Sequence, residues 1–280
     1  MNEQMRRRSV GAPAARSVLL TVLGEFVLPR PEGVWTETLV RALGALDYKT
    51  QAARQALARS VSAGWLATER HGRRSRLQLT PATADMLSSG ADRIYHFGED
   101  RTWDGRWLLV VLRVPEERRE VRHRLRTQLA WAGFGSLGGG LWISPNVDRE
   151  DELRDTAAAR SAADLVSFQA ELGSLGDPAK VVGDAWDLDG VADAYQAFCG
   201  RFGRLRPTTP ESVFRAQTLL VHDWRKFPFL DPDLPDAMLP ARWPRARAQR
   251  IFRERHEQWA GPAQAYFDAL EQGAEAPRAA

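Results

Sequence analysis

Apolar residues recur three and four positions apart in the first part of the chain, which places them on one face of an α-helix. The first such run predicts a helix over residues 16–27, which Pro29 ends because proline cannot continue a helix. A second run predicts a short helix after Thr36. A third predicts a helix over 48–63, with Asp47 as its N-cap. The inward positions of this third helix are Ala53, Ala56, Leu57 and Val61.

After the third helix the pattern changes to that of short strands bounded by turn residues. Strands are predicted over 65–68 and 75–79, and an arginine-rich turn over 70–74 joins them. Three helices followed by a hairpin predict a winged helix-turn-helix domain over residues 14–95. A disordered tail, polar and basic, is predicted to precede it over 1–13.

The middle of the chain predicts elements in the order βαββαβ, which is typical of a ferredoxin-like fold. This order places a central domain over residues 100–175. Such folds serve many functions, so the fold alone assigns none. The expected elements are a strand over 107–112, a helix over 121–132, strands over 135–137 and 141–144, a helix over 149–160 and a strand over 165–170.

The last part of the chain has helical spacing throughout. A helical domain is predicted over 184–271, with one of its helices starting at Pro210, a favoured first helical residue. Residues 272–280 are predicted to be a disordered tail that is polar and rich in alanine. The predicted fold class is therefore α+β and multidomain, with a winged helix, a ferredoxin-like domain and a helical domain in that order.

The stretch GFGSLG, from Gly133 to Gly138, matches the glycine pattern of dinucleotide-binding enzymes. That pattern works only where it follows a strand and opens a helix, because the amides of the helix N-terminus face the pyrophosphate. Here the order is reversed, since the stretch follows a predicted helix and opens a strand. We therefore expect Gly133 to end the helix and the later glycines to form a hairpin turn, with no cofactor bound.

Composition narrows the class of protein. Hydrophobic residues make up 44% and charged residues 27%, as in ordinary globular domains. The single cysteine, Cys199, excludes an intrachain disulfide framework and indicates a reducing cytoplasm. Arg16 and Glu25 interrupt the apolar run near the N-terminus, so that run reads as an amphipathic helix rather than a signal peptide. No run is long enough to span a bilayer, so we expect a soluble, cytoplasmic protein with no membrane partner.

Charge is uneven along the chain. The net charge is only +3, but residues 1–80 carry thirteen basic and six acidic side chains, which suggests a polyanion partner at that end. Gln and Arg can bond to the edges of adenine and guanine in the major groove, and arginines in a turn can neutralise phosphates. Alternatively, these side chains simply solvate an exposed face. The DNA-binding candidates are Lys49, Gln51, Arg54, Gln55 and Arg59 on the helix and Arg70, Arg73, Arg74 and Arg76 in the hairpin.

The segment HDWRKFPFLDPDLP, which starts at His222, permits three interpretations. It could end a helix in a proline-rich turn with inward aromatic residues, which is the interpretation that we favour. It could instead contribute to a ligand pocket. A metal site at His222, Asp231 and Asp233 is the least supported, since their spacing follows no ligand pattern. The ligand-binding candidates are His222, Trp224, Arg225, Lys226 and Phe227.

Catalytic residues do not form a recognisable set. The five histidines are scattered along the sequence, and Cys199 lies in an apolar helix, where packing is the simpler explanation. We therefore predict neither an enzyme nor a metal or cofactor site.

Several blocks of the sequence together resemble the PaaX family of bacterial transcriptional regulators. They follow the family's order and span most of the chain from Arg16 to Leu270. The blocks are YKTQAARQALARSVSAGWLATE, WDGRWLLVVLRVPE, LAWAGFGSLGGGLWISP and LLVHDWRKFPFLDPDLPDAMLPARWP.

The resemblance implies a winged helix, a central ferredoxin-like domain and a C-terminal helical domain. It also implies a homodimer on a palindromic double-stranded DNA operator. Such a dimer represses an aromatic-acid catabolic operon until an acyl-CoA, typically phenylacetyl-CoA, releases it. The central domain also looks like a small CRISPR-associated nuclease, so a nucleic-acid-processing enzyme or RNA-binding module is the alternative. The first strand, however, runs into Leu112–Pro115 without the aspartate that such a nuclease needs.

Overall fold

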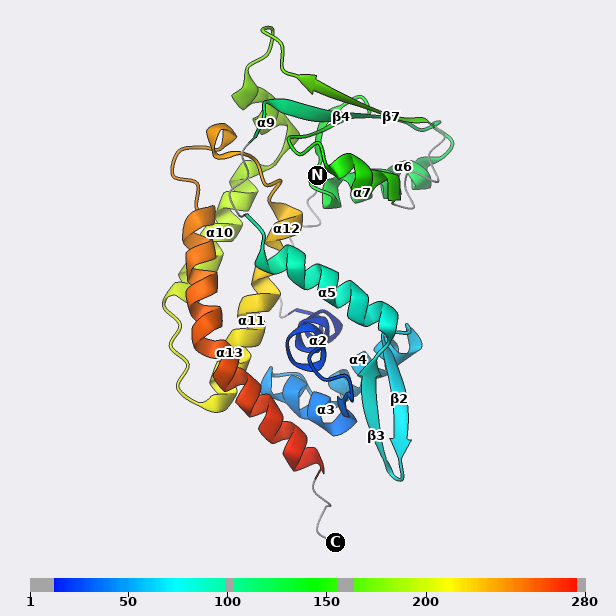
Figure 1. Ribbon diagram of the computed structural model, residues 1–280, viewed down its shortest axis with the longest axis vertical. Coiled ribbons are helices and arrows are strands. Elements are labelled where there is room, and N and C mark those ends of the chain that lie inside the picture. Colours follow the sequence, from blue (N-terminus) through cyan, green and yellow to red (C-terminus); the bar gives the residue numbers. More distant parts are fainter. Residues whose placement is uncertain (1–12, 99–102, 156–163, 276–280) are drawn as a thin grey trace. The chain divides into compact units, whose positions relative to one another are not determined.

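A computed structural model describes residues 13–98, 103–155 and 164–275 of the chain. It is an α+β protein with two antiparallel sheets (Figure 1). The chain divides into two compact units. The first holds the residues up to Tyr95, Phe202–Trp224 and the residues from Ile251 onward, and the second holds His96–Arg201 and Arg225–Arg250. The segment predicted as a separate helical domain therefore contributes residues to both units.

The three predicted helices and the hairpin are present in the first unit. Two further elements, β1 and α5, were not predicted. In chain order the elements are α2 (Ala15–Val22), which continues into the π-helical turn η1 (Leu23–Val27), β1 (Val34–Trp35), α3 (Thr36–Ala45), α4 (Thr50–Ser62), β2 (Leu66–His71), β3 (Arg74–Leu79) and α5 (Pro81–Tyr95).

Helices from far along the chain complete the core of the first unit. The apolar stripe of α2 and η1 is buried, and its Phe26 ring lies 4.9 Å from the ring of Phe214 and 5.2 Å from that of Phe267. Phe214 belongs to α11 (Pro210–Trp224) and Phe267 to α13 (Arg245–Glu275). The N-terminal elements therefore share one hydrophobic core with two C-terminal helices.

The start of α4 differs from the prediction. Asp47 was expected to be the N-cap, but Lys49 occupies that position and provides no side-chain cap. The backbone at Asp47 is left-handed, with φ of 69°, because the chain turns there two residues before the N-cap position. Its carboxylate instead accepts a bond of 2.8 Å from Nη2 of Arg215 in α11.

The hairpin is longer than predicted. β2 pairs with β3 from Leu66↔Leu79 to His71↔Arg74, and β1 adds to the other side of β3. Two residues remain as the turn, and the first of them, Gly72, has φ of +63°. Glycine is the usual residue at this position of a two-residue turn, because a side chain there would be strained.

The second unit has a four-stranded antiparallel sheet in the order β5-β6-β4-β7. The elements from β4 to β7 follow the predicted order. The predicted helix over 149–160 is described only as far as Asp155. The elements are β4 (Arg106–Arg113), α6 (Arg119–Trp131), β5 (Gly135–Gly138), β6 (Leu141–Ser144), α7 (Arg149–Asp155), β7 (Asp164–Glu171), α9 (Pro178–Ala185), α10 (Leu188–Gly203, its last two residues in the first unit), α12 (Phe227–Leu230) and η2 (Asp236–Met238).

The GFGSLG stretch ends a helix and opens a strand, as its sequence context predicted. Gly133 follows the end of α6 with φ of +79°, and the amide of Phe134 donates to the carbonyl of Leu129 across it, as in a glycine helix cap. The stretch then opens β5, so its amides do not face a phosphate site at a helix N-terminus. At Gly140 a Cβ would lie 2.4 Å from the carbonyl oxygen of Leu112, which requires glycine in this hairpin.

The chain ends differ from the predicted tails where they are described. α13 continues through Glu275, so residues 272–275 are helical. The carbonyl of Pro13 accepts a bond of 2.6 Å from the hydroxyl of Tyr48. Predictions for residues 1–12 and 276–280 lie outside the described residues. Within the described ranges, no helix has the length and apolar character required to cross a membrane.

Candidate nucleic-acid interface

Helix α4 has one buried face and one free face. Ala53, Ala56 and Leu57 are at most 3% exposed and hold the helix on the core. The five predicted DNA-binding residues on or beside it are exposed, and none of their side chains bonds to another residue in the described part of the chain. These side chains are therefore available to an external partner. They are Lys49, Gln51, Arg54, Gln55 and Arg59.

The spacing on α4 gathers these side chains in one stripe. Gln51, Gln55 and Arg59 are four residues apart, so they lie above one another along the helix, and Arg54 lies beside them. The stripe carries amide and guanidinium groups. Such groups form bidentate bonds with adenine and guanine edges.

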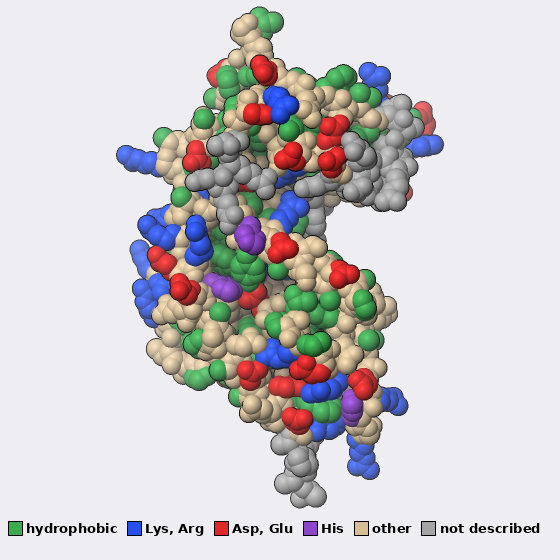
Figure 2. Space-filling model, in the orientation of Figure 1, with side chains coloured by type: hydrophobic (Ala, Val, Ile, Leu, Met, Phe, Trp, Pro, Cys, Tyr) green, Lys and Arg blue, Asp and Glu red, His purple; other side chains and the backbone are tan. Residues whose placement is uncertain are grey.

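The tip of the hairpin is also basic and open. Arg70 and Arg73 are exposed, and the side chains of both lack a bonding partner among the residues that the structure describes. Figure 2 shows basic side chains (blue) that project from the turn between β2 and β3. Such side chains can neutralise phosphates without reading sequence.

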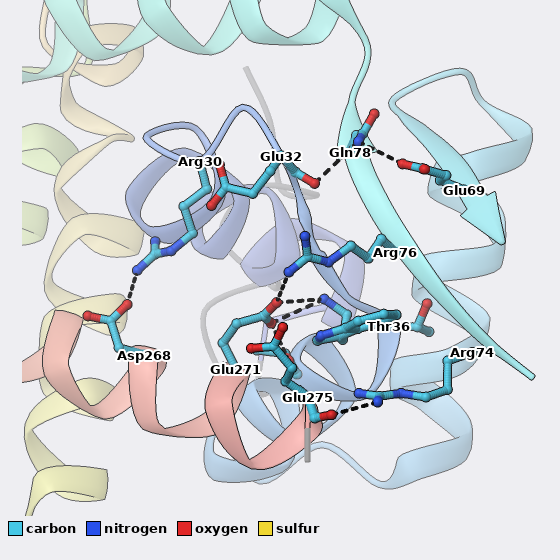
Figure 3. Close-up of polar contacts among 12 residues, drawn as sticks. Arg30, Glu32, Thr36, Glu69, Arg74, Arg76, Gln78, Asp268, Glu271 and Glu275 are labelled. Atoms are coloured by element: carbon cyan, nitrogen blue, oxygen red, sulfur yellow. Dashed lines mark hydrogen bonds and ion pairs between the residues drawn. The ribbon is translucent and has the colours of Figure 1, made fainter. Parts of the chain in front are cut away.

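The two remaining wing arginines are placed differently. The guanidinium groups of Arg74 and Arg76 lie 4.0 Å and 4.8 Å from the ring centre of Trp35. Nη2 of Arg76 donates to Oε1 of Glu271 at 3.1 Å, and Nη1 of Arg74 donates to the carbonyl of Glu275 at 2.8 Å (Figure 3). Both side chains are half-buried and turn toward the end of α13. The hairpin thus has a free tip and an occupied base.

His222 and Trp224 from the predicted ligand site are core residues of the first unit. Nδ1 of His222 lies 3.1 Å from Oγ1 of Thr21, and only 2% of the residue is exposed. Trp224 donates its indole N–H to the carbonyl of Ile94 at 3.0 Å and stacks on Phe252 at 4.7 Å.

The other three candidates lie in the second unit. Phe227 is 3% exposed and stacks on Tyr195 with ring centres 4.1 Å apart. Arg225 is partly buried, and this burial lowers its pKa. Lys226 is exposed. Trp224 and Phe227 are buried, as the favoured interpretation predicted, whereas Phe229 is 43% exposed.

Sequence reasoning missed a buried ion pair in this block. Asp231 is 1% exposed and accepts bonds from Nε and Nη2 of Arg245 at 2.9 and 2.8 Å and from the hydroxyl of Tyr195 at 2.7 Å. It also accepts the amide N–H of Asp233 at 2.8 Å, which forms an Asx turn within the proline-rich segment. Burial beside this carboxylate raises the pKa of Tyr195. No group of three His, Cys, Asp or Glu residues suited to a metal occurs among the described residues.

Comparison with known proteins accounts for nearly the whole chain. Three family models match in succession: "PaaX-like protein" at residues 14–83, "PaaX protein central Cas2-like domain" at 100–182 and "PaaX-like protein C-terminal domain" at 186–269. The chain belongs to the PaaX family.

Two relatives extend this finding. The chain is 29% identical over 246 residues to the transcriptional repressor PaaX of Escherichia coli K12, covering 84% of this chain and 77% of the repressor. It also resembles the solved structure of the uncharacterized protein Rv0674 from Mycobacterium tuberculosis, with a TM-score of 0.62 and 25% identity. That match covers 92% of this chain and 98% of the other.

Two hollows in this PaaX-family chain are large enough for small molecules. One, of about 590 Å³, is lined by residues that include Val182, Trp186 and Met238 in the second unit. The other, of about 280 Å³, is lined by residues that include Glu25 and Gln217 in the first. None of the five predicted ligand residues lines either hollow.

Cys199, the remaining reactive side chain considered from the sequence, is a packing residue. It is 5% exposed, and burial raises the pKa of its thiol. A raised pKa disfavours the thiolate, which is the nucleophilic form.

Proposed function

We propose that this protein is a DNA-binding transcriptional repressor that reads its operator with α4. The observation that carries the proposal is the free stripe of amide and guanidinium groups on α4, next to an arginine-tipped hairpin. Membership of the PaaX family and the similarity to the E. coli repressor support it. In bacteria a repressor of this kind acts in the cytoplasm, where the chromosome lies.

The first unit forms a winged helix-turn-helix in this proposal. Its element order, α2-β1-α3-α4-β2-β3, supports this, with α4 as the helix that enters the major groove. Gln51, Arg54, Gln55 and Arg59 contact base edges, and Lys49 contacts phosphate near the start of the helix. Arg70 and Arg73 contact phosphates from the hairpin tip.

The central segment is a ferredoxin-like domain in the same proposal. The order βαββαβ and the antiparallel sheet β5-β6-β4-β7 support it. The family resemblance further implies a homodimer. Two copies of α4 would then enter major grooves about 34 Å apart and favour a palindromic operator.

The proposed effector is an acyl-CoA such as phenylacetyl-CoA, as the family resemblance implies. We propose that the acyl group binds in the 590 Å³ hollow of the second unit, because the volume of this hollow lies within the ordinary range of ligand pockets. Phenylacetyl-CoA should raise the melting temperature of the wild type. It should raise that of a Trp186→Ala variant less, whereas Arg225→Ala, away from the hollow, should respond like the wild type.

Footprinting on the DNA upstream of the protein's own gene tests the function. We expect protection of two symmetric half-sites at defined salt, and loss of protection when phenylacetyl-CoA is added. Cleavage of the probe, or tighter binding to RNA of the same sequence, would instead support the nucleic-acid-processing or RNA-binding alternative.

A further inference from the structure

Glu271 lies near the end of α13 and makes an unusual set of contacts for a glutamate in the last turns of a helix. Its side chain is only 15% exposed. The carboxylate accepts the backbone N–H of Trp35 at 3.1 and 3.2 Å, the hydroxyl of Thr38 at 2.6 Å and Nη2 of Arg76 at 3.1 Å. Three donors from two parts of the fold, the start of α3 and the strand β3, therefore meet on one carboxylate (Figure 3).

Two of these donors belong to the start of α3. Trp35 is the N-cap residue of α3, and the helix has no side-chain cap of its own. In a capping box, a glutamate three residues into the helix accepts the N–H of the N-cap residue. Here that position is Thr38, whose hydroxyl donates, and Glu271 supplies the carboxylate from α13. The negative charge also lies at the positive end of the α3 dipole.

The third donor belongs to the wing. Arg76 pairs with Trp35 in the β1–β3 ladder, and the guanidinium groups of Arg74 and Arg76 lie on the indole ring. Arg74 also donates to the carbonyl of Glu275, one turn beyond Glu271. The end of α13 thus binds both the helix that precedes α4 and the strand that carries the wing.

We propose that Glu271 is a positioning residue for DNA binding. It holds the start of α3 and the base of the wing in one arrangement, so that α4 and the hairpin tip contact DNA together. Arg74 and Arg76 brace the wing against α13 and do not contact phosphate. The proposal rests on the DNA-binding function proposed above.

Glu271→Ala is the direct test, and Glu271→Gln and Glu275→Ala are its companions. The glutamine keeps a neutral acceptor for Trp35 and Thr38 but loses the charge facing Arg76. Glu275→Ala is the matched control, because the exposed Glu275 side chain is removed while the carbonyl that binds Arg74 remains. Far-UV circular dichroism confirms that each variant is folded.

Amide hydrogen exchange, measured without DNA, reports whether Glu271 stabilises the start of α3 and the strand β3. Glu271→Ala should exchange faster in peptides covering residues 34–38 and 74–79, with Glu271→Gln intermediate and Glu275→Ala like the wild type. On operator DNA, Glu271→Ala should bind about tenfold more weakly, consistent with losing buried bonds to a charged group. The salt dependence of binding should stay unchanged, because no phosphate contact is removed.

The outcomes separate the two proposals. A wild-type protein that binds no DNA contradicts the proposed function, whatever the variants do. A wild type that binds DNA, together with a Glu271→Ala variant of equal affinity and equal exchange, contradicts the role of Glu271 alone. A reduced salt dependence in Arg76→Ala would show that Arg76 contacts phosphate and would overturn the bracing role.

Discussion

The arginines of α4 and those at the base of the wing are the same residue type with opposite surroundings. Arg54 and Arg59 are exposed, and their side chains bond to none of the described residues. Arg74 and Arg76 are half-buried, lie on Trp35 and bond to the end of α13. The first pair is available to an external anion, whereas the second already has partners within the fold.

The comparison shows that a count of basic residues overstates a nucleic-acid interface. Both pairs contribute equally to the positive charge of the N-terminal segment, but only an arginine without an internal partner can give its full charge to phosphate. The partner of Arg76 is Glu271, 195 residues further along the chain.

Removing either arginine of the exposed pair, Arg54 or Arg59, should have the largest effect on DNA binding. We expect each of Arg54→Ala and Arg59→Ala to weaken operator binding by about 1 to 3 kcal/mol, which is roughly 5-fold to 150-fold. Stability should barely change, since neither side chain touches the core. Fluorescence anisotropy at fixed salt and a thermal melt measure the two quantities.

Arg41→Ala provides the control for that experiment. Arg41 lies on α3 of the same unit and pairs at the surface with Glu37, 3.3 Å away. It should bind operator DNA like the wild type. Equal losses in Arg41→Ala and Arg54→Ala would mean that general charge, rather than the face of α4, determines binding.

Removing Arg76 from the occupied base should act mainly on stability. Arg76→Ala leaves one bond of the mostly buried Glu271 carboxylate unmade and removes a cation from the Trp35 ring. We expect the free energy of unfolding to fall by about 1 to 3 kcal/mol. Urea denaturation followed by tryptophan fluorescence measures it, and a wild-type midpoint would contradict the bracing role.

Local periodicity explains why one side of the comparison was predictable from the sequence. The stripe on α4 and the cap at Gly133 depend on residues within a few positions of each other. The environment of Arg74 and Arg76 depends on α13, and that of Asp231 on Tyr195 and Arg245, which approach only in the folded chain. β1 was missed because a two-residue strand has too few positions to show alternation.

Removing the arginines at the tip of the hairpin should change only the electrostatic contribution to DNA binding. Arg70→Ala with Arg73→Ala should lower the slope of log K against log salt by about two, or roughly 0.9 for each phosphate contact. The loss of affinity should be about the same for operator and unrelated DNA, because phosphate contacts carry no sequence information. Anisotropy titrations at several salt concentrations measure both. An unchanged slope would place the tip away from the DNA.

Arg215 is an intermediate case, because it has a partner and is partly exposed, and it should give the smallest effect. Its pair with Asp47 has side chains 35% and 74% exposed, and such surface pairs contribute about 0 to 1 kcal/mol. Asp47→Asn removes the charge and tolerates the left-handed backbone, and asparagine is as favourable an N-cap residue as aspartate. If the ion pair is the role of Asp47, Asp47→Asn and Arg215→Ala should lower the urea midpoint by the same small amount, and the double variant no further. If Asp47 were a cap, Asp47→Asn would change nothing and the two effects would be independent.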